Sequence, residues 1–272
     1  MQGQAGKRTF EVEIIPPKHA SDKIPADLQL FADKYKRVMD SGFTVCITDN
    51  AMGLLAFQGH ECIEYLGLPV KPEQLSIHLN TFHSKADLVK LLDDCNAMGV
   101  RNFLIISGDG SDRLPKLQPH EVEAEGTASV TSVELLAWIK KHYPQFKLGV
   151  AFNPYEPPED EFEKMERKIA AGASFIVTQP IIEKNAIVDE LLEKYPDVPV
   201  IIEAWMSKKL HLLSDAVGYT IPEDTPFDPL TTLEQLLEIY PQCGFYLSIL
   251  GFKTQYGRVE ELAGITKGGD AQ

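Results

Sequence analysis

The sequence predicts an α/β fold, a single (β/α)8 TIM barrel, from three observations. Short runs rich in β-branched residues alternate eight times with longer segments of helical periodicity. The length of 272 residues is typical of a barrel of this kind. No GxGxxG turn follows the first expected strand, which weakens the main rival, an open doubly wound sheet. We therefore expect one domain over residues 1–272, with a short polar tail at 1–7 and a loop insertion near 219–230.

The first expected strand, "RTFEVEII", alternates apolar and acidic side chains. Successive side chains of a strand point to opposite faces, so Phe10, Val12 and Ile14 share one face. Glu11 and Glu13 share the other face. The eight expected strands span residues 9–15, 44–49, 75–81, 102–108, 147–153, 174–181, 198–204 and 244–250.

The expected helices fill most of the gaps between these strands. The clearest one, residues 84–100, begins with Ser84 as its N-cap. Its apolar stripe at helical spacing consists of Leu88, Leu91, Leu92, Cys95 and Met98. Further helices are expected within residues 131–145, 157–173, 185–197 and 231–240. Between the second and third strands, residues 51–74 show only a short helix.

Composition argues against several classes of protein. The formal net charge of −14 is opposite to the basic face that nucleic-acid binding requires. No apolar stretch approaches the roughly 18 residues of a membrane span. The N-terminal "MQGQAGKRTF" lacks the apolar region of a signal peptide, so we expect a cytoplasmic location.

The cysteines and histidines show no metal-binding pattern. Cys46, Cys62, Cys95 and Cys243 form no CxxC pair, so we expect free thiols that are mostly buried. His78 and the histidine five positions later have no HExxH-like context. The sequence therefore predicts no metal site.

Glu13 is the first candidate for chemistry. In a barrel the strands are covered on both faces, so Glu11 and Glu13 would point into the interior. Glu13 lies nearer the C-terminal end, where catalytic groups of such barrels gather, and loss of solvation there should raise its pKa. A raised pKa suits a general acid working near neutral pH. We interpret Glu11 as structural or solvent-linked and leave it out of the site.

Polar residues also end most of the other strands. They are Thr48, His78, Asp109, Asn153, Gln179, Glu203 and Ser248. A purely structural barrel would carry apolar side chains at these positions. Some of these residues could instead be buried polar groups that only bond one another, but the ring as a whole indicates a functional site.

Five stretches near the strand ends share a further pattern. In chain order they read "FEVEIIPPK", "IHLNTF", "LIISGDG", "GVAFNPYEPPE" and "AAGASFIVTQP". Together they resemble the methylenetetrahydrofolate reductase family, whose corresponding stretches include "FEFFPP", "ALRGD" and "ITQ". The resemblance runs from residue 9 to about residue 222 and weakens after that.

The resemblance implies a barrel that binds FAD and reduces 5,10-methylenetetrahydrofolate to 5-methyltetrahydrofolate with electrons from NAD(P)H. Glu13 matches the catalytic acid, which protonates the folate so that its five-membered ring opens to an N5 iminium. Asp109 matches an aspartate beside flavin and pterin, and Gln179 matches a glutamine that hydrogen-bonds folate. We group Glu203 and Ser248 with Gln179 as substrate-binding. The expected cofactor-binding residues are Thr48, His78, Ser107, Asn153 and Lys168.

Several of these positions have a simpler interpretation. Lys168 could be an ordinary surface lysine on its helix, and His78 could only bond a neighbouring backbone group. Asp109 in "SGDGSD" could form a turn unaided. Gln179, directly before Pro180, could simply end a strand.

The departures from the family pattern lie mostly on the flavin side. Ser107 stands where the family usually has arginine, the stretch "TDNAMGLLAFQGHE" replaces a glycine-rich basic one, and "FYLSILGF" replaces "FYTLNR". The tyrosine expected near Val130 is absent. Glu13, Asp109 and Gln179, on the pterin side, match better.

Three hypotheses follow. The first is a flavin-dependent methylenetetrahydrofolate reductase with an altered cofactor pocket. The second is a flavin-free folate enzyme that takes hydride directly from a nicotinamide or exchanges a methyl group with a partner protein. The third is a folate-binding barrel without turnover, which would not need the acid at Glu13. The sequence favours the first, names no partner besides a small folate, and leaves open whether the protein forms a homo-oligomer.

Overall fold

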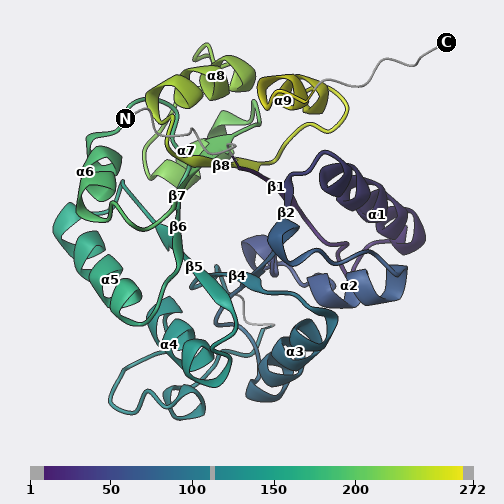
Figure 1. Cartoon of the computed structure of the whole chain (residues 1–272), viewed down its shortest axis with the longest axis vertical. Coiled ribbons are helices and arrows are strands. Elements are labelled where there is room, and N and C mark those ends of the chain that lie inside the picture. Colours follow the sequence, from purple (N-terminus) through teal and green to yellow (C-terminus); the bar gives the residue numbers. More distant parts are fainter. Residues whose placement is uncertain (1–8, 111–113, 266–272) are drawn as a thin grey trace, which may run out of the picture.

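Eight parallel strands close into a barrel in the order of the chain, from β1 to β8 (Figure 1). The structure is a computed structural model that describes residues 9–110 and 114–265. Helices surround the barrel, as expected of a (β/α)8 fold. The predicted fold class is therefore confirmed. The expected N-terminal tail at 1–7 lies outside the described residues.

Each expected strand overlaps an observed one. The strands are β1 (Phe10–Ile14), β2 (Thr44–Ile47), β3 (Leu75–Leu79), β4 (Asn102–Ile105), β5 (Lys147–Phe152), β6 (Phe175–Thr178), β7 (Val200–Trp205) and β8 (Gly244–Ser248). All except β7 end earlier than expected. Asp49, expected in the second strand, accepts a hydrogen bond from the backbone N–H of Asn80.

The described residues contain nine α-helices, where eight were expected. They are α1 (Ile24–Asp40), α2 (Gly59–Leu66), α3 (Lys85–Met98), α4 (Ser132–His142), α5 (Pro158–Ala170), α6 (Ala186–Lys194), α7 (Leu210–Val217), α8 (Pro229–Ile239) and α9 (Tyr256–Leu262). Ser84 caps α3 as expected, since its hydroxyl accepts from the Asp87 N–H. Both α7 and α8 lie between β7 and β8, and α8 begins at Pro229, two residues before the expected start.

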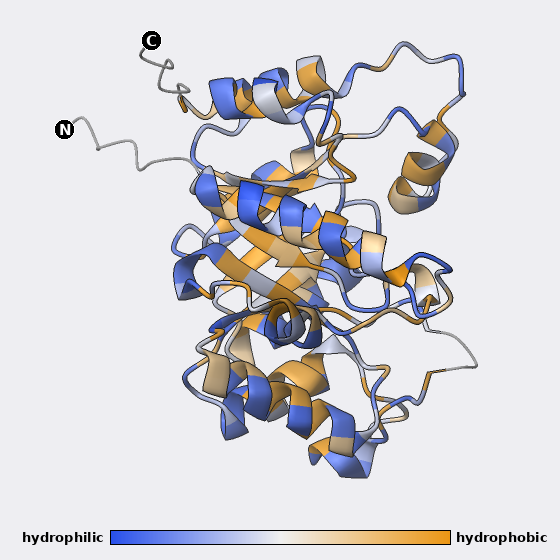
Figure 2. Ribbon diagram, turned by 90° about the vertical axis from the view of Figure 1, so that its right-hand side faces the viewer, coloured by the Kyte–Doolittle hydropathy of each residue, from blue (hydrophilic) through white to orange (hydrophobic). Residues whose placement is uncertain are grey.

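The two faces of β1 meet different surroundings, as the alternation predicted. Phe10, Val12 and Ile14 are buried in the core between strands and helices. Figure 2 shows these apolar strands at the centre, with the polar residues of the helices toward the outside. A second, smaller apolar cluster fills the barrel interior and consists of Cys46, Leu104, Val177, Ile201 and Tyr246. No helix within the described ranges is both long and apolar enough to cross a membrane.

Gly149 on β5 makes room for an aromatic ring inside the barrel. A Cβ built at Gly149 would overlap the ring of Phe175 on β6, which packs against the interior cluster. A Cβ built at Gly257 on α9 would meet no atom within 4 Å. The same substitution is therefore expected to act oppositely at these two positions.

Gly149→Ala should lower the free energy of unfolding by about 1–3 kcal/mol, because the methyl group forces Phe175 out of its place. Gly257→Ala should raise it by up to about 1 kcal/mol, because alanine restricts the unfolded chain and favours helix. Urea denaturation of both variants beside the wild type measures the difference. Equal effects at both positions would contradict the crowding at Gly149.

Candidate active site

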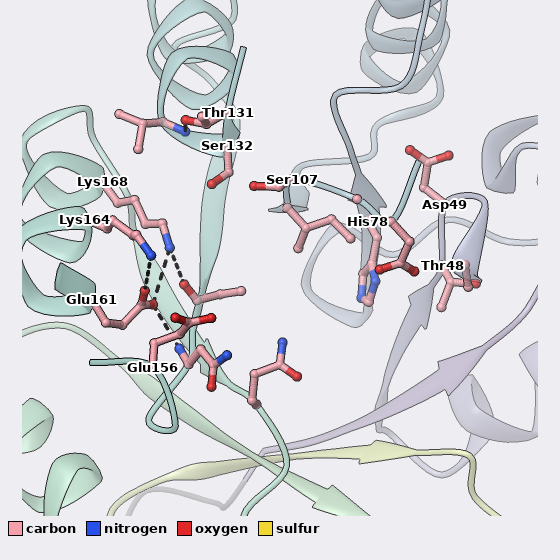
Figure 3. Close-up of a pocket in the computed structure, with 18 of the residues that line it drawn as sticks. Thr48, Asp49, His78, Ser107, Thr131, Ser132, Glu156, Glu161, Lys164 and Lys168 are labelled. Atoms are coloured by element: carbon pink, nitrogen blue, oxygen red, sulfur yellow. Dashed lines mark hydrogen bonds and ion pairs between the residues drawn. The ribbon is translucent and has the colours of Figure 1, made fainter. Parts of the chain in front are cut away.

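A cavity of about 710 Å³ opens at the C-terminal ends of the strands. Its walls come from β1, β3 and β5, from the segments after β2, β4, β5 and β6, and from α5 and the start of α4 (Figure 3). Its volume is in the range of small-molecule and cofactor sites. Eight of the ten expected site residues line it, namely Glu13, Thr48, His78, Ser107, Asp109, Asn153, Lys168 and Gln179. The other two, Glu203 and Ser248, do not line it.

Glu13 lies at the cavity floor with both carboxyl oxygens engaged. Its Oε2 accepts from the Tyr246 hydroxyl at 2.8 Å, and its Oε1 accepts from the Ile249 N–H at 3.3 Å. Burial raises the pKa of Glu13, and these two hydrogen bonds offset the rise only in part. A raised pKa is what the position of Glu13 in the barrel predicts, and a carboxyl with a raised pKa can act as a proton donor.

The Ile249 N–H reaches Glu13 through an unusual backbone conformation. Ile249 follows β8 and has φ of 54°, in the left-handed region that β-branched residues rarely adopt. Backbone strain of this kind persists where the surroundings enforce it, often at functional sites. Sequence reasoning missed Ile249, because nothing in an isoleucine signals a left-handed conformation.

Glu11 lies deeper in the barrel than Glu13 and outside the cavity wall. Its Oε2 accepts a hydrogen bond from the Cys46 thiol at 3.1 Å. Burial raises the pKa of Glu11 to about 7, and the thiol lowers it by less. Glu11 therefore forms part of the barrel interior and does not face the site.

Thr48 and His78 present buried polar atoms without partners. Within the described residues, neither the Thr48 hydroxyl nor Nε2 of His78 has a hydrogen-bond partner, and both side chains are at most 7% exposed. Burial lowers the pKa of His78 to about 4, although Asp49 raises it slightly, so the ring is neutral at physiological pH. An unpaired buried polar atom at a cavity wall is costly, and a ligand would satisfy it.

Lys168 is a buried residue of the cavity wall, so its interpretation as a surface lysine is wrong. Its Nζ donates to the Ala151 carbonyl at 2.6 Å and lies 3.9 Å from Oε1 of Glu161. Burial lowers the pKa of Lys168, and Glu161 counteracts this effect. The same Glu161 oxygen accepts from the Asn153 N–H at 2.9 Å and so joins α5 to the end of β5.

Two further cations on α5, Lys164 and Arg167, line the same wall. Lys164 lies 3.5 Å from Glu161, and Arg167 lies 3.0 Å from the buried Glu134 of α4. Figure 3 shows Lys164, Lys168 and Glu161 on one side of the cavity, opposite Thr48 and His78. Sequence reasoning predicted Lys168 but missed Glu161, Lys164 and Arg167. The spacing of Glu161, Lys164 and Lys168 at i, i+3 and i+7 could have placed all three on one helix face.

The remaining expected residues are held by contacts between loops. Oδ2 of Asp109 accepts from the Met52 N–H at 2.9 Å, which ties the loop after β4 to the loop after β2. Oδ1 of Asn153 accepts from the Tyr155 N–H at 3.1 Å. The Ser107 carbonyl accepts from the Thr81 hydroxyl at 2.8 Å. Gln179 contributes its side chain to the cavity wall.

A buried pair that begins at the cavity wall joins the segments after β2 and β3. Oδ2 of Asp49 lies 2.7 Å from Nε2 of His83 and also accepts from the Asn80 N–H at 3.0 Å. Asp49 and His83 are both buried. Sequence reasoning missed the pair, since its members follow different strands.

Glu203 and Ser248 lie beside Glu13 rather than on the cavity wall. The pKa of Glu203 is raised to about 8, mainly by burial and in addition by the charge of Glu13. The Ser248 hydroxyl donates to the Ala204 carbonyl at 3.4 Å. All four cysteines are free and buried, as expected. Over residues 9–110 and 114–265, no group of three or more His, Cys, Asp or Glu side chains is arranged to hold a metal ion.

The buried carboxyl of Glu11 gives a prediction on stability. Its folded pKa of about 7 exceeds the ordinary value of 4.5, so the folded state binds more protons than the unfolded state between these values. Stability must then fall as pH rises through this window, by on the order of 3 kcal/mol at most. Glu11→Gln should therefore lose less stability than the wild type between pH 5 and pH 8 in urea denaturation.

The matched control for this variant is Glu193→Gln, which changes an exposed glutamate of α6. Its loss of stability over the same pH range should equal that of the wild type. A Glu11→Gln profile parallel to both would show that Glu11 is not desolvated in the folded protein.

Comparison with known proteins agrees with this geometry. The family model described as methylenetetrahydrofolate reductase matches residues 1–224. A probable methylenetetrahydrofolate reductase (NADPH) from Caenorhabditis elegans is 28% identical over 127 residues, covering 44% of this chain and 17% of that protein. Methylenetetrahydrofolate reductase 2 from Schizosaccharomyces pombe is 25% identical over 169 residues, covering 54% and 26%. The matched part of this chain thus spans about a quarter or less of these relatives.

Two solved structures share the fold at low sequence identity. A protein from Clostridium thermocellum that binds two copies of 5-methyl-5,6,7,8-tetrahydrofolic acid has a TM-score of 0.61 and 15% identity, covering 95% of this chain and 93% of its own. The dihydropteroate synthase of Yersinia pestis has a TM-score of 0.50 and 10% identity, covering 96% and 93%. These likenesses show the fold alone. The family is shown by the sequence match over most of the chain: this protein belongs to the methylenetetrahydrofolate reductase family.

Proposed function

We propose that this chain reduces 5,10-methylenetetrahydrofolate to 5-methyltetrahydrofolate, with electrons from NAD(P)H passed through FAD. One observation carries the proposal: the carboxyl of Glu13 lies at the floor of the cavity, desolvated and with a raised pKa. Family membership supports it, because Glu13 matches the catalytic acid of that family. Binding alone would not require an acid in a desolvated position.

The proposed step for Glu13 is proton donation to the folate. Glu13 gives its proton to the ring nitrogen whose bond to the bridging carbon breaks, and the other nitrogen, N5, forms the iminium with that carbon. A hydride that originates from NAD(P)H then adds to the same carbon and yields the methyl group. One proton and one hydride are consumed in each turnover. The Tyr246 hydroxyl and the Ile249 N–H stabilise the glutamate that remains.

Asp109 and Gln179 are proposed to orient the folate. Both line the cavity, and the family pattern places them against the pterin. The carboxylate of Asp109 would stabilise the positive charge that develops on the opened folate. Its bond to the Met52 N–H fixes the position of that charge.

The cavity wall offers groups that fit FAD. The unpaired Thr48 hydroxyl and Nε2 of His78 could bond a polar ring system on one side. The cations of α5, among them Lys168, could hold phosphates on the other side. When bound, FAD would relay the hydride between nicotinamide and folate. We propose Thr48, His78, Ser107, Asn153 and Lys168 as the residues that hold it.

The flavin-free alternative has a specific observation in its favour. The cations of α5 already face buried carboxylates: Lys164 and Lys168 face Glu161, and Arg167 pairs with Glu134. These acids reduce the attraction of the cavity wall for a diphosphate. The position where the family usually has a cationic arginine holds Ser107, so no further positive charge compensates. In this alternative the folate would take hydride directly from a nicotinamide, or exchange a methyl group with a partner protein.

Glu13→Gln tests the proposed acid. Because glutamine cannot donate the proton, the folate half-reaction should slow by about 10²–10⁴-fold. Reduction of bound flavin by NAD(P)H should survive, since it does not need this proton. Stopped-flow absorbance of each half-reaction separates the two effects. Equal loss of both half-reactions would remove the role of acid from Glu13.

Glu11→Gln is the matched control, because it changes a buried carboxyl two positions away that does not line the cavity. It should leave both half-reactions close to wild type.

A visible absorbance spectrum separates the flavin-dependent reading from the alternative. The spectrum is recorded on the purified protein, after denaturation, and after incubation with excess FAD. We expect a flavin band in the native or the reconstituted protein. A colourless protein that takes up no FAD would overturn the flavin-dependent proposal and leave the flavin-free one.

A further inference from the structure

The peptide unit between Ser248 and Ile249 connects the two strands that flank β8. Strand β8 lies between β7 and β1 and pairs with both (Figure 1). The Ser248 carbonyl accepts from the N–H of Met206, directly after β7, at 3.0 Å. The Ile249 N–H donates to Oε1 of Glu13, on β1, at 3.3 Å. The C=O and N–H of one trans peptide point in opposite directions, so the bond to Met206 aims the N–H at Glu13.

A second set of bonds holds the chain just after Ile249. The Gly251 N–H donates to Oε1 of Gln255 at 2.7 Å, and Nε2 of the same side chain donates to the Met206 carbonyl at 3.0 Å. A Cβ built at Gly251 would lie 2.8 Å from Oε1 of Gln255, so the glycine leaves room for this amide. Met206 thus anchors the chain on both sides of Ile249, directly at Ser248 and through Gln255 at Gly251. We call these three hydrogen bonds the Met206 network.

The Met206 network explains the left-handed backbone of Ile249. Only Ile249 and Leu250 lie between the two anchored residues, so the chain has to turn within them. The φ of 54° at Ile249 is costly for a β-branched side chain. That side chain is 39% exposed, so its burial offsets little of the cost. The bonds on either side therefore hold the strained turn in place.

We propose that Ile249 positions the carboxyl of Glu13 through its N–H, and that Gln255 holds Ile249 in the conformation this requires. The inference deepens the proposed function and rests on it for the identity of the substrate that Glu13 protonates. Neither Ile249 nor Gln255 lines the cavity. Both are therefore positioning residues that act through Glu13.

The two hydrogen bonds of Glu13 differ in length. The bond from the Tyr246 hydroxyl, at 2.8 Å, has the ordinary length of an O–H···O bond. The contact from the Ile249 N–H, at 3.3 Å, exceeds the usual N–H···O length of about 2.9–3.0 Å. When the O–H bond of Glu13 breaks and its proton passes to the folate nitrogen, the carboxylate that remains is a stronger acceptor. The N–H bond then strengthens, and an interaction that strengthens during proton transfer lowers its barrier.

Isoleucine-selective 15N labelling tests the contact of Ile249 with Glu13 without any substrate. The amide proton of Ile249, assigned by its loss in Ile249→Gly, should move downfield as Glu13 ionises with rising pH, because a carboxylate is the stronger acceptor. Glu13→Gln should abolish this movement. An Ile249 amide that does not titrate in the wild type, or that titrates equally in Glu13→Gln, would overturn the inference.

Glu13 shares the barrel interior with other titratable side chains, which supply the controls. They are Glu11 on β1, Cys46 on β2, His78 on β3, Glu203 on β7 and Tyr246 on β8. Burial raises the pKa of the thiol and of the phenol and lowers that of the imidazole, so the two carboxyls are the ones that ionise near neutral pH. The titration of the Ile249 amide should persist in Glu11→Gln and in Glu203→Gln. Its loss in either variant would show a general effect of interior charge and no specific contact.

Gln255→Leu tests the second part of the proposal, because it removes two bonds of the Met206 network at similar side-chain size. The titration of the Ile249 amide should be lost. The folate half-reaction should slow by about 10–100-fold, the effect of one hydrogen bond to a charged group. Reduction of bound flavin by NAD(P)H should keep its wild-type rate in stopped-flow absorbance. Where Gln255→Leu does not fold, Gln255→Glu should show the same split, since it keeps the acceptor for Gly251 and loses the donor to Met206.

Gln74→Leu is the matched control for Gln255→Leu. Gln74 is also half-buried, and its Nε2 donates to the carbonyls of Met39 and Phe43 at 3.3 and 3.1 Å. These contacts lie at the opposite end of the barrel, where β2 and β3 begin. Gln74→Leu should leave the amide titration and both half-reactions at their wild-type values.

The positioning of Glu13 and the proposed function fail in different ways. An Ile249 amide that titrates with Glu13 in a protein without folate turnover would reject the proposed function and keep the positioning. An unchanged folate half-reaction in a folded Gln255→Leu, or an equal loss of both half-reactions, would reject the role of Gln255 and keep the proposed function.

Discussion

The pairing of β1 with β8 is the constraint on which the site depends. It joins Phe10 to Phe245 and Val12 to Leu247, and so closes the barrel between the two ends of the chain. An unpaired β1 would be an edge strand with its glutamates in water. Closure instead places Glu13 in a desolvated interior, where the Tyr246 hydroxyl can reach it from a residue 233 positions away. The unusual chemistry of Glu13 is therefore a product of the barrel topology rather than of its local sequence.

The cavity combines an acidic floor with a wall that carries paired charges. Glu13 at the floor has a raised pKa because burial removes solvent from its carboxyl. On α5 each cation has a carboxylate close by, so the wall is polar without a large excess of positive charge. The floor suits proton donation, and the wall can bind a ligand by exchanging partners.

The sequence contained enough information for the fold and for much of the cavity wall. The two-residue alternation in β1 predicted that Glu13 points inward, because burial on both faces follows from the barrel. The bounds of most strands were too long; after β2, for example, Asp49 bonds across to the segment after β3, a contact that no periodicity describes. Lys168 looked exposed because its neighbours in α5 are charged; only the packing of α5 on β5 buries it.

Other features of the site depend on three-dimensional contacts that a single sequence does not encode locally. The left-handed backbone of Ile249 and the buried pair of Asp49 and His83 both follow from how separate strands come together. Glu203 was expected on the substrate side from its place at a strand end. Glu203 does not line the cavity, although its strand neighbour Tyr246 bonds to Glu13, which does.

The apolar cluster inside the barrel has a consequence for how reactants enter and products leave the cavity. Cys46, Leu104, Val177, Ile201 and Tyr246 are each at most 7% exposed, and they fill the barrel below the cavity. A barrel filled in this way has a cavity that opens at one end only, and no channel runs through it. Reactants and products must then pass through the same entrance. Two reactants that occupy the same space in the cavity have to bind one after the other.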